Sequence, residues 1–256
     1  MSAERRPHIL ILGGTGEAAA LARAIAGEWG EAVRLTSSLA GRVERPGPLP
    51  GDVRVGGFGG VAGLVAYLRD EQVDLLVDAT HPFADRISSH ARQAAEAVGL
   101  PRLGFARPLW QRDPVDRWIE VETVEQAAQA AGDISKRAFL TVGRTEITPF
   151  AQTSDVWFLV RLVDPPEAPL PLPDHETVIA RGPFTVAGER ELMLHHRIDL
   201  LITKASGGAA TEAKILAARE ADIPVLMVRR PRPEPGRRVS DVEAAMSWIS
   251  DQVGVV

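Results

Sequence analysis

The sequence predicts an α/β protein made of two similar Rossmann-like domains, each with a parallel sheet. Short apolar runs alternate with amphipathic stretches along the 256 residues, as strands and helices alternate in such sheets. Each strand candidate is a continuous apolar run, as expected when helices cover both faces of a sheet. The second half of the chain also repeats short patterns of the first half, which favours two domains over one long sheet.

In the first half, apolar runs predict strands and amphipathic periodicity predicts the helices between them. In chain order, the expected strands are 9–12, 32–36, 75–78 and 102–105, and the expected helices are 17–26, 61–69 and 84–97. Residues 164–174 carry five prolines and cannot form a regular helix. Residues 241–251 have the pattern of a final helix, for which Ser240 is the expected cap.

Three segments of the first half return in the same order in the second half. Residues 139–145 echo 9–15, residues 198–205 echo 73–80, and residues 223–231 echo 100–108. We therefore expect domains at 1–108 and 109–256, the last helix being able to pack back on the first domain. Strand–turn–helix units that look alike by chance are the alternative.

The overall composition excludes several classes of function. With a net charge of −5 the chain has no global basic field for nucleic acid or an anionic membrane. The absence of cysteine excludes disulfides, thiolate metal sites and cysteine nucleophiles. The first apolar run is too short for a signal peptide or a membrane span, so a cytoplasmic protein is expected.

Arginine dominates the basic residues. Of 29 basic residues, three are lysine and 26 are arginine. The planar guanidinium suits carboxylate and phosphate recognition. A GC-rich genome produces the same bias, so composition alone leaves both explanations open.

A glycine-rich turn follows the first expected strand. Gly14-Thr15-Gly16-Glu17-Ala18-Ala19 fits the pattern G-x-G-x-x-G/A between a strand and a helix. In that position glycines let the backbone approach a pyrophosphate over the helix N-terminus. We expect Gly14, Thr15, Gly16 and Glu17 to bind a dinucleotide. A glycine turn needed only for packing is the alternative.

The segment after the second expected strand distinguishes between cofactors. An NAD site usually places an acid there, whereas this chain has Ser37, Ser38 and Arg42 and no carboxylate. Hydroxyls and a cation suit a 2′-phosphate, so the cofactor expected is NADPH. The missing acid also argues against a methyltransferase that uses S-adenosylmethionine. Arg42 is otherwise a solvated loop residue.

Two further loops precede helices of the first half. Gly57 lies in the glycine run 56–60 and is expected to contact the cofactor, although a hinge is an equal alternative. Thr80 and His81 leave the end of a strand, where open α/β sheets bind ligands. We expect Thr80 to contact the cofactor and His81 to serve in proton transfer. His81 is otherwise a residue at a helix start.

In the second half, cations and small residues stand at the ends of expected strands. Lys204 follows a strand and precedes a helix, so its side chain and the helix N-terminus together suit an anion. We expect Lys204 to be catalytic and Arg144, Arg181, Ser206 and Gly207 to bind substrate; each cation alone is equally explained as a surface charge. No metal-ligand spacing is found, and neither Ser88 nor Ser206 lies in a nucleophile elbow.

The chain resembles the precorrin-6A reductases of corrin (cobalamin) biosynthesis along nearly its whole length. The residues that carry the resemblance are 13–18, 38–42, 57–60, 78–84 (Asp-Ala-Thr-His-Pro-Phe-Ala, the most distinctive), 181–184, 204–208 and 223–225. The resemblance implies NADPH-dependent reduction of one macrocycle double bond, converting precorrin-6A to precorrin-6B.

The resemblance also implies two α/β domains with the macrocycle in the cleft between them, its carboxylates oriented by arginines. It further implies hand-over of the tetrapyrrole from other corrin-pathway enzymes. Whether the substrate is metal-free or carries cobalt is left open by the sequence. In the implied reaction a hydride moves to a ring carbon and a proton follows. His81, Lys204 and water are the candidate proton sources.

Two other functions fit parts of the pattern. One is an NADP-dependent oxidoreductase acting on another anionic small molecule. The common short-chain type is disfavoured because the only tyrosine, Tyr67, lacks the lysine of a Tyr-x-x-x-Lys pair. The other is a non-catalytic NADP-binding regulatory module, which has no need for a second anion-binding edge.

Overall fold

The computed structural model describes residues 5–41 and 48–254, in two compact units. One comprises Met1–Arg107 and Pro231–Val256, and the other Pro108–Arg230. Each unit contains one six-stranded sheet, and every strand pairing is parallel, so the expected α/β class with two Rossmann-like sheets is confirmed. In the described part of the chain no helix is long and apolar enough to cross a membrane.

The first unit alternates strands and helices and receives its last two elements from the C-terminus. Its elements are β1 (His8–Leu12), α1 (Gly16–Trp29), the 3-10 helix η1 (Gly30–Ala32), β2 (Arg34–Leu39), β3 (Asp52–Val55), α2 (Gly60–Asp70), β4 (Leu75–Asp78), α3 (Asp85–Val98), β5 (Arg102–Phe105), β12 (Arg238–Val239) and α7 (Val242–Val253).

The second unit has the same alternation with additional 3-10 turns. Its elements are β6 (Trp118–Val121), α4 (Val124–Ile134), β7 (Arg137–Leu140), η2 (Arg144–Glu146), η3 (Thr148–Gln152), β8 (Trp157–Leu162), β9 (His175–Ile179), α5 (Val186–His195), β10 (Leu200–Lys204), η4 (Ala209–Thr211), α6 (Ala213–Glu220) and β11 (Val225–Val228).

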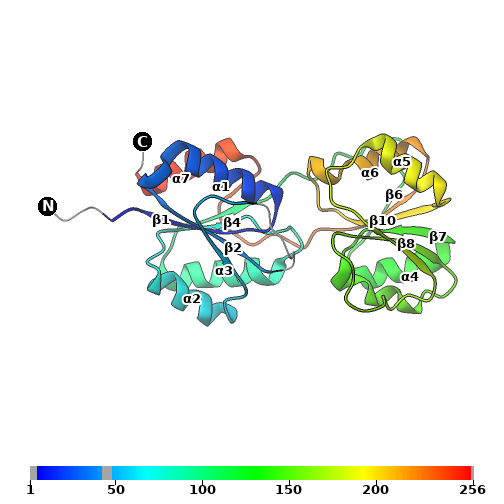
Figure 1. The fold of residues 1–256 in the computed structure, drawn as a ribbon, viewed down its shortest axis with the longest axis horizontal. Coiled ribbons are helices and arrows are strands. Elements are labelled where there is room, and N and C mark those ends of the chain that lie inside the picture. The colour runs from blue at the N-terminus through cyan, green and yellow to red at the C-terminus, as the bar shows by residue number, and fades with distance from the viewer. Residues whose placement is uncertain (1–4, 42–47, 255–256) are drawn as a thin grey trace. The chain divides into compact units, whose positions relative to one another are not determined.

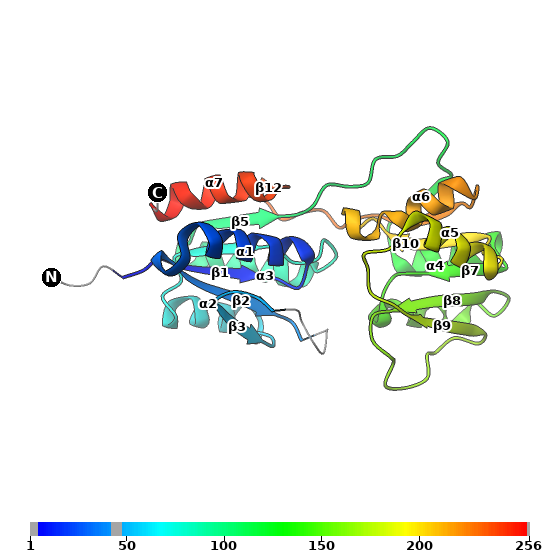
Figure 2. The ribbon, with the colours of Figure 1, turned by 45° about the horizontal axis from the view of Figure 1, so that its top comes forward.

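In the first unit helices cover both faces of the sheet, as Figures 1 and 2 show. Alternate residues of β1 point to opposite faces. Ile9 and Ile11 share a core with α1 and α7, while Leu10 and Leu12 share a second core with α2 and α3. Burial on both faces explains why these strands are apolar throughout.

The second unit is also layered. Phe139 and Leu201 of its central strands share a core with Met193 of α5 and Ile215 of α6. On the other face α4 packs beside η3, whose buried Phe150 contacts Phe158 of β8 edge to face, with ring centroids 5.6 Å apart.

The two sheets have the same strand order. The first reads β3-β2-β1-β4-β5-β12 and the second β9-β8-β7-β10-β11-β6. After β5 the chain leaves the first unit and forms β6, which pairs with β11 in the second sheet, and then α4. After β11 the chain returns to the first unit and forms β12, which pairs with β5, and then α7. If the chain is divided after α4, each of the two parts gives its last strand–helix pair to the unit that the other part builds.

This exchange modifies the expected domain ranges. Residues 231–256 group with the first unit, whereas the expected range 109–256 kept them with the second, except that the last helix was expected to be able to pack back on the first, as α7 does. The returning segment is held by α7, which packs on α1, and by β12, whose Arg238 pairs in register with Gly104 of β5. A strand needs its neighbour in the sheet, so the unit to which it belongs is fixed by pairing.

Two details differ from the expected elements. The second strand runs to Leu39 because it pairs with β3, an edge strand that the sequence did not indicate. The helix expected from residue 241 begins at Val242, and its cap is Asp241, whose carboxylate accepts a hydrogen bond from Ala244 N at 2.8 Å, in place of Ser240. Residues 164–174 form neither helix nor strand, as expected.

His8 links three elements of the first unit at the start of β1. The residue is 1% exposed, its Nδ1 lies 2.9 Å from the carbonyl oxygen of Glu71, and its Nε2 lies 2.8 Å from Thr36 Oγ1. A carbonyl only accepts, so Nδ1 carries the proton and Nε2 accepts from the threonine hydroxyl. Burial lowers the pKa of His8 below its ordinary value of 6.5.

The lowered pKa predicts that His8 makes the protein less stable in mild acid. Unfolded His8 takes up a proton near pH 6.5 while folded His8 resists it, so the stabilisation is present above pH 6.5 and is lost as pH falls through the folded pKa. His8→Gln is expected to flatten the fall in the free energy of unfolding between about pH 7 and 5, measured by urea denaturation. His195→Gln, at an exposed histidine, is the control; equal slopes for wild type and His8→Gln would contradict the assignment.

Candidate functional site

The loops after β1, β3 and β4, together with the end of β2, lie at the carboxyl edge of the first unit's sheet. β4, β1, β2 and β3 are parallel neighbours, so the loops after them leave from one edge. Backbone bonds join these loops: Gly13 N donates to the carbonyl of Ser38 (2.9 Å), and Ala79 N donates to that of Leu12 (2.9 Å). The strand order reverses between β1 and β4, which is where open α/β sheets bind ligands.

The glycine turn between β1 and α1 is open on its ligand-facing side. Gly14 has φ +103°, a conformation that favours glycine, and a Cβ built at Gly14 or Gly16 meets no atom within 4 Å. Thr15 is the N-cap of α1: its Oγ1 accepts from Ala18 N (3.0 Å) and donates to the carbonyl of Ala79 (2.8 Å). The expected binding residue Thr15 therefore uses its side chain to join the loops after β1 and β4.

Glu17, expected at the cofactor, forms an ion pair. Its carboxylate lies 3.1 Å from the guanidinium of Arg107, the last residue of the first unit before the chain crosses. Both side chains are largely buried. Arg107 compensates a negative charge that would otherwise repel a pyrophosphate at this helix N-terminus.

The expected ribose-binding serines lie inside β2, where the sequence placed a loop. Ser37 and Ser38 are only 3% and 6% exposed, and both pair with β3. The hydroxyl of Ser38 accepts a hydrogen bond from Arg54 Nη1 at 2.7 Å. Arg42, the third residue expected there, falls outside the described residues.

Arg54 is a cation that the sequence analysis missed. It belongs to β3 and its guanidinium also donates to the carbonyls of Gly56 (3.1 Å) and Gly57 (3.1 Å). A Cβ built at Gly57 meets nothing within 4 Å, so the loop expected to contact the cofactor is open to approach. The signal available in the sequence was an arginine two residues before a glycine run.

The segment after β4 is ordered by a buried carboxylate. Asp78 Oδ1 accepts from the hydroxyl of Thr80 (2.7 Å) and from its backbone N–H (3.3 Å). The same hydroxyl lies 3.3 Å from Ser88 Oγ of α3. Thr80, expected at the cofactor, thus fixes the turn that carries His81.

His81 is half-buried in a tight turn before α3. Phe83 N lies 3.3 Å from its Nδ1, and the two rings are 5.9 Å apart, so the neutral ring carries its proton on Nε2. The helix begins at Asp85 and its N-cap is Ala84, which makes no side-chain cap bond. His81 therefore lies in the turn that leads into the helix, where its carbonyl accepts a hydrogen bond from Ala84 N (2.7 Å), and its role in proton transfer stays a prediction.

In the second unit Lys204 ends β10 and forms an ion pair with Glu146 of η2. The helix that we expected directly after it is displaced: a loop and the 3-10 helix η4 intervene before α6 begins at Ala213. The N-cap of α6 is Glu212, a carboxylate residue. Residues 205–208 thus separate Lys204 from the helical segment that begins at Ala209, and an anion site at Lys204 stays a prediction.

The loop that carries Ser206 and Gly207 is held by both chain crossings. Arg230 donates from Nε to the carbonyl of Ala205 (2.7 Å) and from Nη2 to that of Ser206 (2.7 Å). Trp110 Nε1 donates to the carbonyl of Gly208 (3.1 Å). A Cβ at Gly207 would lie 2.0 Å from the carbonyl oxygen of Pro108, so only glycine fits there. These two expected substrate residues present backbone held in a fixed shape.

Arg144 and Arg181, also expected to bind substrate, are half-exposed and loosely paired. Arg144 lies 3.5 Å from Glu167 and Arg181 lies 3.8 Å from Asp164, both on the proline-rich segment after β8. Exposed pairs of this kind contribute little to stability. Both guanidiniums are therefore able to exchange these partners for another carboxylate.

The segment with Arg181 is positioned by a buried ion pair. Arg161 of β8 binds Glu189 of α5 through two hydrogen bonds of 2.9 and 2.7 Å, and its guanidinium lies 4.1 Å from the centre of the Phe184 ring. Removing one partner of such a buried pair costs about 3–5 kcal/mol. A Cβ at Gly182 would lie 2.9 Å from the carbonyl oxygen of Ala210, so the loops after β9 and β10 meet.

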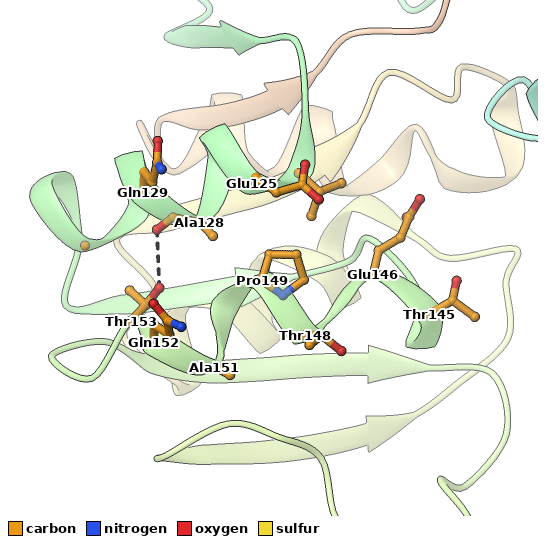
Figure 3. Close-up of a pocket in the computed structure, with 12 residues that line it drawn as sticks. Glu125, Ala128, Gln129, Thr145, Glu146, Thr148, Pro149, Ala151, Gln152 and Thr153 are labelled. Carbon is orange, nitrogen blue, oxygen red and sulfur yellow. Dashed lines mark hydrogen bonds between the residues drawn. The ribbon is translucent and has the colours of Figure 1, made fainter.

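A cavity of about 1020 Å³ lies in the second unit between α4 and the 3-10 helices η2 and η3 (Figure 3). Its described lining includes Glu125 and Glu146 and no lysine or arginine. A polycarboxylate would be repelled there, so this cavity does not suit an anionic macrocycle. Among the described residues no group of histidines and carboxylates is arranged to hold a metal ion.

The first unit fits a bound dinucleotide. Its glycine turn is open to the approach of a diphosphate, and the first turn of α1 leaves N–H groups without an intrahelical acceptor. The end of β2 offers hydroxyls and Arg54 where an acid would repel a 2′-phosphate. Gly14, Gly16, Ser38 and Arg54 are the residues best placed to hold it.

The comparison with known proteins covers nearly the whole chain. Residues 8–250 match the model of the family described as "Precorrin-6x reductase CbiJ/CobK". A precorrin-6A reductase of Rhodococcus erythropolis is 49% identical over 94% of this chain and 96% of the relative, and one of Mycobacterium tuberculosis is 45% identical over 94% and 97%. A cobalt-precorrin-6A reductase of Priestia megaterium is 29% identical over 95% and 98%.

A solved structure described as "CobK precorrin-6A reductase" is 41% identical, covers 96% of this chain and 97% of its own, and superposes with a TM-score of 0.90. This chain belongs to the precorrin-6x reductase family.

Proposed function

We propose that this chain reduces one macrocycle double bond of precorrin-6A to give precorrin-6B, with NADPH as the reductant. The observation that carries the proposal is the near-full-length identity of 43–49% to several precorrin-6A reductases. Cobalt-precorrin-6A reductases are only 25–29% identical, so the metal-free macrocycle is the substrate that we favour. We also propose a cytoplasmic location and hand-over of the tetrapyrrole from other enzymes of the route.

The first unit has the task of holding the nucleotide. Gly14 and Gly16 admit the diphosphate at the start of α1, while Arg107 neutralises Glu17 beside it. Ser38 and Arg54 stand at the end of β2 and β3, where the adenosine ribose of a Rossmann cofactor lies. NADPH, when bound, supplies the hydride.

The second unit has the task of binding the macrocycle carboxylates. Arg144, Arg181 and Lys204 each pair with a carboxylate of the chain itself: Glu167, Asp164 and Glu146. A substrate carboxylate of the same chemistry is able to replace those partners. The backbone at Ser206 and Gly207 gives this surface a fixed shape.

Two side chains are candidates to provide the proton that completes the reduction. His81 lies in the turn that follows β4, with its Nδ1 3.3 Å from Phe83 N, and an imidazole at this strand end suits proton transfer. Lys204, whose side chain pairs with Glu146, is the second candidate. Hydride and proton transfer otherwise depend on positioning, which the anchored loops supply.

The proposed reaction predicts substrate-dependent oxidation of NADPH by the purified protein. With precorrin-6A, the absorbance of the reduced nicotinamide is expected to fall when NADPH is the cofactor and to fall much more slowly with NADH. The reason is that the end of β2 has no carboxylate to bind the ribose hydroxyls of NADH. A reaction without the macrocycle is the control. If NADPH binds but is not oxidised, the substrate would instead be the cobalt-bearing form or another anionic molecule.

For His81 we expect a loss of turnover without a loss of cofactor binding. His81→Ala should lower kcat about 10²-fold, because general acid catalysis contributes at least that much, and leave the Kd for NADPH unchanged. His90→Ala, at a half-buried histidine on α3, is the matched control. Near wild-type kcat for His81→Ala, together with a large loss for Lys204→Met, would transfer the role to Lys204.

The half-exposed arginines of the second unit should act on substrate binding alone. Arg144→Gln and Arg181→Gln are each expected to raise the KM for precorrin-6A about 3- to 10-fold, since each removes one partly solvated charge-assisted bond. The Kd for NADPH should not change. Arg117→Gln, at the opposite edge of the same sheet and paired only with Asp222 among the described residues, serves as the control. An equal rise for Arg117→Gln would indicate a general charge effect.

A further inference from the structure

Arg54 is held in place by four neighbours without a carboxylate among them. Its Nη1 donates to Ser38 Oγ (2.7 Å) and to the carbonyl of Gly56 (3.1 Å), and its Nη2 donates to the carbonyl of Gly57 (3.1 Å). The centre of the guanidinium lies 3.8 Å from the centre of the Phe58 ring. The side chain is therefore fixed in one orientation before any ligand binds.

None of the ion pairs that the first unit forms within the described part of the chain includes Arg54. No carboxylate there neutralises its charge. An aromatic ring and three uncharged acceptors stabilise a guanidinium but leave its net charge in place. A neutral donor is sufficient to tie Ser38 to the glycine loop. A fixed, half-buried cation with its charge uncompensated is what an anionic ligand group requires.

The position of Arg54 specifies which anion it suits. Ser38 stands at the end of β2, the strand beside the glycine-turn strand, and the adenosine ribose of a dinucleotide lies at that strand end. Because Ser38 Oγ accepts from Arg54, its own hydrogen is available for a second acceptor. The pair thus offers a guanidinium and a hydroxyl donor at the 2′-position of the ribose.

We propose that Arg54, stacked on Phe58 and joined to Ser38, recognises the 2′-phosphate and so contributes the preference for NADPH over NADH. This inference rests on the proposed NADPH-dependent function. The phosphate is a dianion with oxygens in the geometry that a planar guanidinium matches, whereas the free hydroxyl of NADH gives Arg54 little to bind.

The test compares cofactors differing only in that phosphate. The Kd values of NADPH and NADH, and of 2′-AMP and 5′-AMP, are measured by calorimetry at one salt concentration for wild type, Arg54→Gln and Arg54→Lys. Arg54→Gln is expected to weaken NADPH and 2′-AMP about 10- to 100-fold and NADH and 5′-AMP less than about 3-fold. Arg54→Lys should recover part of the loss, because it keeps the charge and loses the planar fork.

Two controls separate recognition from loop support. Arg69→Gln removes an exposed arginine from the far end of α2 and should leave all four Kd values unchanged. Ser38→Ala leaves Arg54 stacked on Phe58. It should weaken the binding of NADPH more than that of NADH, but by a smaller factor than Arg54→Gln does. If Arg54→Gln weakened both cofactors equally, Arg54 would be a support for the glycine loop. If it weakened neither, Arg54 would have no part in cofactor binding, and either result would overturn the inference.

Failure of the proposed function gives a different result. In that case wild type itself binds NADPH no more tightly than NADH, or binds neither, and no variant can alter a preference that does not exist. If wild type clearly prefers NADPH over NADH and Arg54→Gln keeps that preference, NADPH would stand as the cofactor and Arg54 would not be the residue that recognises its 2′-phosphate.

Discussion

The exchange of strand–helix pairs between the two units is the constraint on which the rest of the structure depends. Each sheet is completed by a strand from the other half of the chain, β12 beside β5 and β6 beside β11. The chain must therefore cross twice, and an arginine marks each crossing. Arg107 binds Glu17 at the start of α1, and Arg230 binds the carbonyls of Ala205 and Ser206. The same covalent path that completes the sheets thus fixes one loop in each candidate site.

Fixed loops suit a reaction in which the cofactor supplies the chemistry. Reduction by a nicotinamide needs its acceptor carbon held close and correctly oriented, and little else from the protein. The chain provides this by capping and pairing: Thr15 joins the loops after β1 and β4, and Asp78 orders the turn before His81. The groups that we propose to bind substrate, Arg144 and Arg181, have by contrast solvent-accessible carboxylate partners at 3.5 and 3.8 Å, which a ligand can replace.

The sequence alone predicted the parallel α/β class and most strands because apolar runs report burial on both faces of a sheet. It missed β3, whose residues are mostly exposed at the edge and carry no apolar run. It assigned residues 231–256 to the second half because pairing between distant strands leaves no local pattern. The echo of Arg107-Pro108 in Arg230-Pro231 was visible, but only the strand order shows that it marks the two crossings.

The candidate site was predictable where a motif is local and lost where a side chain arrives from elsewhere in the chain. Gly14 and Gly16 follow from strand–turn–helix spacing, which a short window contains. Arg54 does not: it lies sixteen residues after Ser38, and only the pairing of β2 with β3 brings the two together. Glu146 and Lys204 meet in the same way, from the loops of neighbouring strands. In a doubly wound sheet, the strand order decides which residues meet at the carboxyl edge. A cation that binds a ligand there need not belong to the loop whose sequence motif predicts the site.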